Sequence, residues 1–203
     1  MITNNSNNNK ENASMNHFKR RIFTYNLLKS DLSFLISNRS KLIVAMKNEK
    51  LGKKFSKKIM MVTTAINGCT ICAWAQTKMA TKAGVDKQEI RNILNSQFET
   101  EASDYELLAL QFAQEFAETN RYPSQELLDS LEAFYGNQTA QDIMLLTRLS
   151  TFGNLTGNTF DAFISRLKGK GARNSNQIFE FLFFILLAPF LLPILPLVHN
   201  KES

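Results

Sequence analysis

The chain has 203 residues, of which 44% are hydrophobic and sixteen are phenylalanine, so it can form one globular domain with appended segments. Two cysteines are too few for a secreted scaffold that depends on several disulfides. The net charge of +6 is unevenly spread: residues 1–60 hold thirteen basic and three acidic side chains, and residues 86–142 hold three and twelve. The basic part suits an anionic membrane surface or an acidic protein surface. Nucleic acid is not a predicted partner, because the sequence contains no recognised binding module.

The N-terminal third begins with a polar segment and continues with a helical pattern. Residues 1–15 are rich in Asn and predict a disordered tail without the apolar stretch of a secretory signal, so we expect a cytoplasmic domain. From residue 17 to about residue 38, apolar residues recur at helical spacing. A short helix is predicted over residues 42–46. After Gly52, another is predicted over residues 53–66 and ends at Asn67-Gly68.

The two cysteines, Cys69 and Cys72, form a Cys-x-x-Cys motif directly after Gly68. Strong helix formers follow up to Gly84, so the motif is predicted to open a helix. The free N–H groups and the dipole of a helix N-terminus favour a thiolate. Two less favoured interpretations are a pair of inert apolar cysteines and a structural zinc site. Zinc would need two further ligands, and the two histidines lie far away in sequence, so no metal is predicted.

The remaining pattern is helical as well. Short helices are predicted from residue 86 to about residue 95 and from Pro123-Ser124 to Gly136, and a long one over residues 139–167. Ser103 and Glu106 match a capping box that opens a further helix. Gly153 and Gly157 lie four residues apart in the long helix and predict a smooth strip for close helix packing rather than for ligand contact. The fold class is therefore all-α.

The C-terminal segment differs from the rest of the chain. Residues 181–198 form an eighteen-residue run without a charged or polar side chain, about 27 Å long as a helix. Basic residues precede the run, which would keep the N-terminal domain cytoplasmic. Three prolines within the run make a straight span harder to form. A membrane-spanning tail anchor is the favoured interpretation; a shallow or re-entrant membrane segment and a docking peptide for an apolar groove remain open.

The motif and its surroundings resemble the carboxymuconolactone decarboxylase and AhpD-like (alkylhydroperoxidase) family. The resemblance rests on a helix that ends in Asn67-Gly68, on Cys-x-x-Cys, on a helix that closes in Lys-Ala-Gly-Val, and on the stretches 135–143 and 152–161. It covers about residues 20–170. It implies an AhpD-like helical bundle, here with a hydrophobic C-terminal tail, that assembles as a homo-oligomer. It also implies thiol-dependent reduction of a hydroperoxide or of a disulfide partner, without metal or cofactor.

The sequence departs from the redox branch of that family at two positions. In that branch a Glu before the motif and a His after it relay a proton to the second cysteine. Lys57 and Gln76 stand at these positions here. Gln76 cannot carry a proton near neutral pH, whereas Lys57 either holds a thiolate electrostatically or is one more solvated cation. We treat both residues as site-modulating.

The domain and function predictions combine these features. The expected segments are a tail (1–15), an AhpD-like domain (16–170), a linker (171–177) and a membrane-associated segment (178–198). Cys69 and Cys72 are the candidate catalytic residues; Cys69 is expected to be the more exposed and to meet the substrate, and Cys72 to complete the disulfide. The favoured function is a hydroperoxide-reducing enzyme at the cytoplasmic face of a membrane, supplied with electrons by a thiol donor. The alternative is a redox-inactive, membrane-tethered interaction or sensor module. A decarboxylase reaction is less favoured, because no general base is evident.

Overall fold

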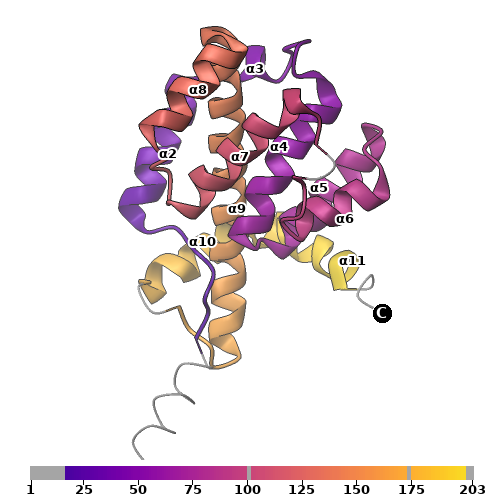
Figure 1. The fold of residues 1–203 in the computed structure, drawn as a ribbon. Coiled ribbons are helices and arrows are strands. Elements are labelled where there is room, and N and C mark those ends of the chain that lie inside the picture. Colours follow the sequence, from indigo (N-terminus) through magenta and orange to yellow (C-terminus); the bar gives the residue numbers. More distant parts are fainter. Residues whose placement is uncertain (1–16, 100–101, 173–174, 200–203) are drawn as a thin grey trace, which may run out of the picture.

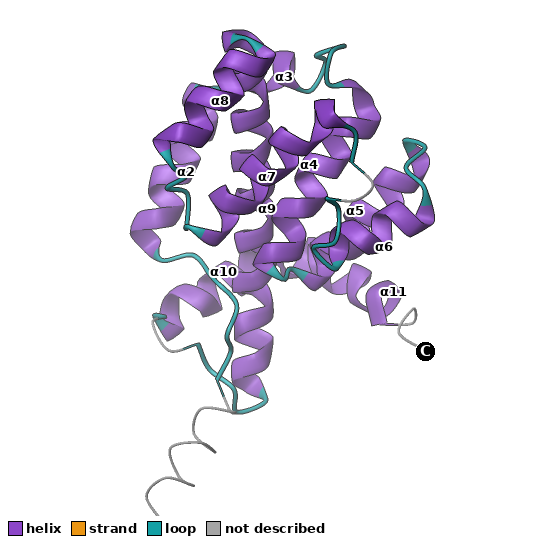
Figure 2. Ribbon diagram, in the orientation of Figure 1, coloured by secondary structure: helices purple, strands orange, loops and turns teal. Residues whose placement is uncertain are grey.

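The computed structural model describes residues 17–99, 102–172 and 175–199. It is all-α, as the sequence predicted, and no β-strand occurs among these residues (Figure 2). The predicted disordered tail over residues 1–15 lies outside the described part. In chain order the helices are α2 (Tyr25–Ser37), α3 (Arg39–Ala45), α4 (Gly52–Asn67), α5 (Thr70–Lys82), α6 (Lys87–Leu94), α7 (Asp104–Glu118), α8 (Gln125–Tyr135), α9 (Asn137–Leu167), α10 (Gln177–Leu191), the 3-10 turn η1 (Leu192–Ile194) and α11 (Leu195–His199).

Two helices organise the bundle (Figure 1). Helix α9 has 31 residues, about 46 Å at 1.5 Å per residue, and runs along most of the molecule. Helix α4 packs against α9 and also contacts α5, α6 and α7. The main core lies between these helices and includes Ile59, Phe112 and Ile143, each fully buried. At the other end of α9, α10 packs back on it and α11 contacts α5.

The N-terminal part of the predicted 17–38 helix is not helical. Helix α2 begins at Tyr25, and the Thr24 side chain caps it by accepting a hydrogen bond from the Leu27 amide at 3.3 Å. Before it, Phe18 pairs with Ala172 in an isolated bridge. The amide of Phe23 donates to the hydroxyl of Thr159 at 2.9 Å. The prediction was wrong for residues 17–24 because partners on and beyond α9 satisfy this backbone in an extended form.

The prediction that the side chains of Ser103 and Glu106 form a capping box is also wrong. Ser103 is the N-cap residue of α7, but its side chain makes no capping hydrogen bond. Glu106 instead accepts from the Lys58 ammonium at 2.8 and 2.9 Å, and Glu89 pairs with the same ammonium. Lys58 is 4% exposed, so its charge needs these carboxylates. The cluster ties α4 to α6 and α7.

Helix α10 is held against α9 by a buried ion pair. Glu180 is fully buried, and it accepts from Arg166 Nε at 2.7 Å and from a second guanidinium nitrogen at 3.0 Å. Phe183 packs beside Phe23 and Leu155. The opposite face of α10 is apolar and exposed, and includes Ile178, Phe181, Leu182, Ile185, Leu186 and Phe190.

The segment Gln177–Val198 is apolar and long enough to cross a membrane by length and composition alone. Pro189 lies inside α10, and Pro193 lies in the turn that separates α10 from α11. The domain boundaries predicted from the sequence stay a prediction.

Candidate active site: the Cys69–Cys72 pair

Cys69 and Cys72 form a disulfide at the N-terminus of α5, with their Cα atoms 5.2 Å apart. The preceding helix α4 ends as predicted, with Gly68 in the left-handed conformation (φ 65°) that glycine adopts without strain. Cys69 is the N-cap residue of α5, and its sulfur accepts from the Cys72 amide at 3.3 Å. The motif therefore opens a helix, and the Cys69 sulfur lies among the free N–H groups that stabilise negative charge.

The disulfide lies directly against α9 at Gly157. A Cβ atom on Gly157 would lie 2.5 Å from the Cys69 sulfur and 3.1 Å from the Cys72 sulfur. A Cβ atom on Gly153, one turn earlier, would have no neighbour within 4 Å. The Cys72 sulfur lies 3.5 Å from the Gly153 carbonyl oxygen, which can accept from the thiol of the reduced form. The glycine pair was predicted to allow close helix packing. At Gly157 the missing side chain instead leaves room for the disulfide at the start of α5.

The exposure of the two sulfur-bearing residues is the reverse of what the sequence suggested. Cys69 is 1% exposed, whereas Cys72 is partly exposed. The expectation took the first residue of the helix to be the outer one. An N-cap side chain instead folds back over the helix end, and here Gly157 leaves room for it to turn inward.

Arg20 holds the loop before the disulfide in place, a role that no sequence pattern predicted. One nitrogen of its guanidinium lies 3.1 Å from the Gly68 carbonyl, 3.4 Å from the Thr70 hydroxyl, 3.3 Å from Asn158 Oδ1 and 3.0 Å from Asp161 Oδ2. These acceptors lie on the loop, at the first residue of α5 and on α9. No local pattern marks Arg20, which is one of several cations in a basic stretch.

Asn158 completes this support. Its side-chain amide donates to the Asn67 carbonyl at 2.9 Å and to the Arg21 carbonyl at 3.0 Å. Asn158 is fully buried, so these bonds fix the end of α4 and the N-terminal segment against α9. The position of the disulfide is thus set by contacts from three separate parts of the chain.

Gln76 follows Cys72 by one helical turn and is 7% exposed. Its Oε1 atom is buried without a hydrogen-bond partner in the structure. Burial of an unpaired amide oxygen is costly, and such groups are uncommon in folded proteins. Gln76 therefore places an unsatisfied acceptor next to the pair, where the redox branch of the resembled family has a proton-carrying histidine.

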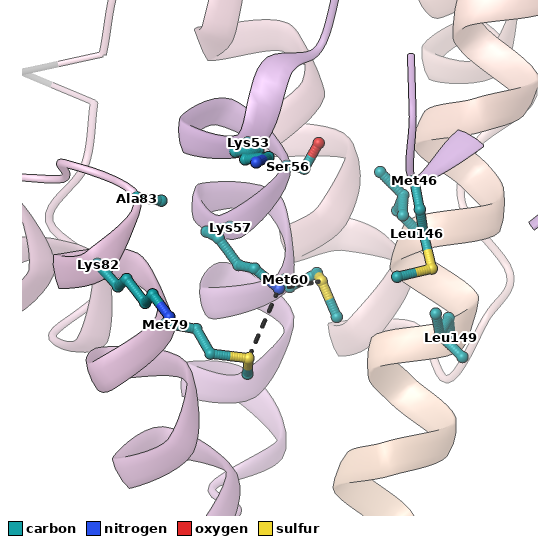
Figure 3. A pocket seen from close by; sticks show the side chains of 10 residues that line it. All are labelled: Met46, Lys53, Ser56, Lys57, Met60, Met79, Lys82, Ala83, Leu146 and Leu149. Atoms are coloured by element: carbon teal, nitrogen blue, oxygen red, sulfur yellow. Dashed lines mark hydrogen bonds between the residues drawn. The ribbon is translucent and has the colours of Figure 1, made fainter. Parts of the chain in front are cut away.

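Lys57 does not contact the disulfide through any interaction found among the described residues. Its ammonium lies 3.9 Å from the Met60 sulfur and 3.8 Å from the Met79 sulfur (Figure 3). Burial lowers the pKa of Lys57 below the usual 10.5. Figure 3 shows Lys57 directed from α4 toward Met79 on α5, inside a pocket. The assignment of Lys57 and Gln76 as site-modulating stays a prediction.

The C-terminal segment covers the outer side of the motif. Val198 of α11 is buried with Ile71 and Phe160, and Trp74 packs against the same cluster. The side of α5 that carries Ile71 is thereby packed between α9 and α11, whereas Cys72 stays partly exposed. Within the described ranges, no three His, Cys, Asp or Glu side chains come together as a group that could hold a metal ion.

The region around the two cysteines matches a known protein family. Residues 38–115 match the model of the carboxymuconolactone decarboxylase family. The predicted family resemblance is confirmed. The matched carboxymuconolactone decarboxylase region begins at α3, includes both cysteines and reaches into α7.

The family match is narrower than the resemblance that the sequence suggested over about residues 20–170. The stretches of α8 and α9 that contributed to it lie outside residues 38–115, as does the tail, so their part in the resemblance stays a prediction. No curated protein and no solved structure matches the chain significantly.

Proposed function

We propose that the Cys69–Cys72 pair cycles between dithiol and disulfide and reduces hydroperoxides with electrons from a thiol donor. The observation that carries the proposal is the disulfide at the N-terminus of α5, inside a carboxymuconolactone decarboxylase family region. A helix N-terminus stabilises a thiolate, which is the reactive form of cysteine. The proposed catalytic residues are Cys69 and Cys72.

The partly exposed Cys72 is the sulfur that meets the peroxide. Its thiolate attacks the outer peroxide oxygen, an S–O bond forms as the O–O bond breaks, and the alkoxide leaves as the alcohol with the proton that the Cys72 thiol gave up. The Cys69 thiolate then attacks the sulfenic sulfur, the S–S bond forms as the S–O bond breaks, and the hydroxide leaves as water with the proton that the Cys69 thiol gave up. This assignment reverses the expectation from the sequence, because Cys69 is 1% exposed and suits the second, internal step.

The donor returns the electrons by thiol–disulfide exchange. One donor thiolate attacks the Cys72 sulfur and displaces Cys69 as a thiolate, which the Cys72 amide and the α5 dipole stabilise. A second donor thiol then displaces Cys72 and leaves as the donor disulfide. Cys69 is the better leaving group of the two because it is the N-cap residue.

Peroxide consumption by the full-length protein with a dithiol donor tests the proposal. The serine variants Cys69→Ser and Cys72→Ser serve as controls for each other, since each removes one sulfur. Both should lose turnover, but only Cys69→Ser should retain one round of peroxide reduction and accumulate a sulfenic acid. Consumption by Cys72→Ser at the wild-type rate would end the enzyme proposal, and a sulfenic acid on Cys69 would reverse the proposed order.

A second candidate function is a redox-inactive interaction or sensor module, favoured by Lys57 and Gln76. Neither side chain replaces the proton relay, since Gln76 does not titrate and Lys57 contacts methionine sulfurs. Thiol titration separates the two candidates. A lowered thiol pKa supports the enzyme, and ordinary values for both cysteines with no internal disulfide support the module.

The remaining proposals concern partners and location. The apolar segment Gln177–Val198 would hold the protein at the cytoplasmic face of a membrane, with the exposed Lys168 and Lys170 near anionic headgroups. Assembly as a homo-oligomer follows from the family resemblance. Neither a metal nor another cofactor takes part in the proposed cycle.

A further inference from the structure

A pocket of about 400 Å³ is lined mainly by residues of α4, α5 and α9, the helices that also carry or pack against the redox pair. Its volume is in the range of small-molecule sites. The lining is largely apolar and rich in methionine, whose flexible thioether adapts to a bound chain. The lining residues are Met46, Lys53, Ser56, Lys57, Met60, Met79, Lys82, Ala83, Leu146 and Leu149 (Figure 3).

The pocket carries positive charge without a carboxylate of its own. Three lysines and no acidic residue line it. Two other lysines on α4, outside the pocket, do have carboxylate partners. Lys54 lies 3.8 Å from Glu89, and Lys58 is bound by Glu89 and Glu106. Across the described parts of the chain, no carboxylate lies within ion-pair distance of Lys57, whose ammonium contacts thioether sulfurs, which are weak acceptors.

A half-buried ammonium with such partners is poorly satisfied, and this is why burial lowers its pKa. An anion in the pocket would supply the missing partner. Ser56 adds no free donor toward an anion, since its hydroxyl donates to the Gly52 carbonyl at 2.7 Å. The lining thus fits a ligand with one anionic end and an apolar body.

The pocket also lies in line with the disulfide. Met79 follows Cys72 by seven residues on α5, about 10 Å along the helix axis. On α9, Leu149 lies one turn before Gly153, whose carbonyl oxygen is 3.5 Å from the Cys72 sulfur. Gln76, with its unpaired oxygen, lies between Met79 and Cys72 in the sequence of α5. A chain-like ligand in the pocket is therefore held within about two helical turns of the reactive pair.

We propose that this pocket binds a medium-chain aliphatic carboxylate, with the carboxylate on Lys57 and the chain against Met60, Met79, Leu146 and Leu149. Binding at this pocket needs no redox chemistry at Cys72, so it can be measured separately from peroxide reduction.

The test is binding of decanoate, below its micelle concentration, to the purified full-length protein by calorimetry. Decanoate should bind saturably, and Lys57→Met should weaken its binding about tenfold or more, the size of a charge-assisted hydrogen bond. Lys57→Arg keeps the charge and should retain binding. Lys54→Met removes a cation from the same helix outside the pocket and should also retain it. Decylammonium, which has the same chain with a cationic head, should bind at least about tenfold more weakly than decanoate.

Three results would overturn the proposal. Absence of saturable decanoate binding is the first. Equal affinities for decanoate and decylammonium are the second, because they would indicate adsorption of the chain to the exposed apolar face of α10. Equal losses in Lys57→Met and Lys54→Met are the third, because they would indicate a general charge effect. Circular dichroism verifies that each variant is folded.

Discussion

Gly153 and Gly157 are one turn apart on α9, yet the structure gives them opposite roles. A methyl group on Gly157 would collide with the Cys69 sulfur at 2.5 Å, whereas a methyl group on Gly153 meets open space. Arg20 and Asn158 hold the backbone carbonyls just before Cys69, so its sulfur cannot yield easily.

Gly157→Ala should therefore destabilise the protein by about 1–3 kcal/mol, the usual cost of overpacking. Gly153→Ala is the matched control, and it should be neutral or stabilising by up to about 1 kcal/mol, because alanine favours the helix more than glycine does. Chemical denaturation of both variants measures the difference. Equal stabilities would show that the disulfide does not pack against α9 as described.

Tyr135 is a second residue whose environment is testable. It is 7% exposed, and its hydroxyl donates to the Tyr105 carbonyl oxygen. Burial raises the pKa of Tyr135 to about 12, from the usual 10.0. Because the folded state holds this proton more tightly than the unfolded state, the stabilising contribution is complete below pH 10 and is lost as the pH rises toward 12.

Between pH 9 and pH 12, the wild type should lose more stability than Tyr135→Phe does, by on the order of 2–3 kcal/mol. The pKa of Lys58 also affects alkaline stability: burial lowers it, but the bonds to Glu106 and Glu89 raise it overall. The Lys58 contribution is the same in the wild type and in Tyr135→Phe, so it cancels when the two losses of stability are subtracted. Unfolding free energies across the pH range measure the effect, and parallel curves would contradict it.

At the scale of elements, the helix boundaries that depend on local signals were predictable. Asn67-Gly68 ends α4, Cys69 begins α5, and Gly136 separates α8 from α9, because each is set by residues adjacent in the chain. These signals also located the candidate site.

The features that the sequence did not predict depend on distant partners. Residues 17–24 are extended because of contacts on and beyond α9, and Glu106 leaves its capping position for Lys58. The burial of Cys69 depends on Gly157, and the role of Arg20 depends on acceptors up to 141 positions away. Hydrophobic periodicity carries no information about such pairs.

The ion pair between α9 and α10 supports a prediction at this scale. Arg166→Met removes the partner of Glu180, whose side chain is fully buried. A buried charge left unpaired costs about 3–5 kcal/mol, which should release α10 from α9. Limited proteolysis should then cleave near residues 167–177 in the variant and not in the wild type. Lys168→Met, an exposed neighbour, is the control, and cleavage in both variants alike would refute the role of the pair.

At the scale of the whole molecule, the proposed membrane association depends on the exposed apolar face of α10. Leu182 and Leu186 are 61% and 68% exposed there, and a charged side chain in place of each removes apolar surface that would enter the membrane. The full-length protein should float with anionic vesicles, and the double variant Leu182→Asp/Leu186→Asp should not. Tyr122→Asp changes an exposed residue elsewhere and should float. If all three proteins float, the exposed face of α10 is not what binds the vesicles.

Intact-protein mass spectrometry shows whether Cys69 and Cys72 form a working redox couple. The reduced full-length protein is mixed with one equivalent of hydroperoxide, and the loss of two hydrogen masses is followed over time and located by peptide mapping. A Cys69–Cys72 link should form much faster than a free cysteine is oxidised, and a dithiol donor should reverse it. Two cysteines that stay unlinked, or that oxidise only as fast as free cysteine, would contradict it.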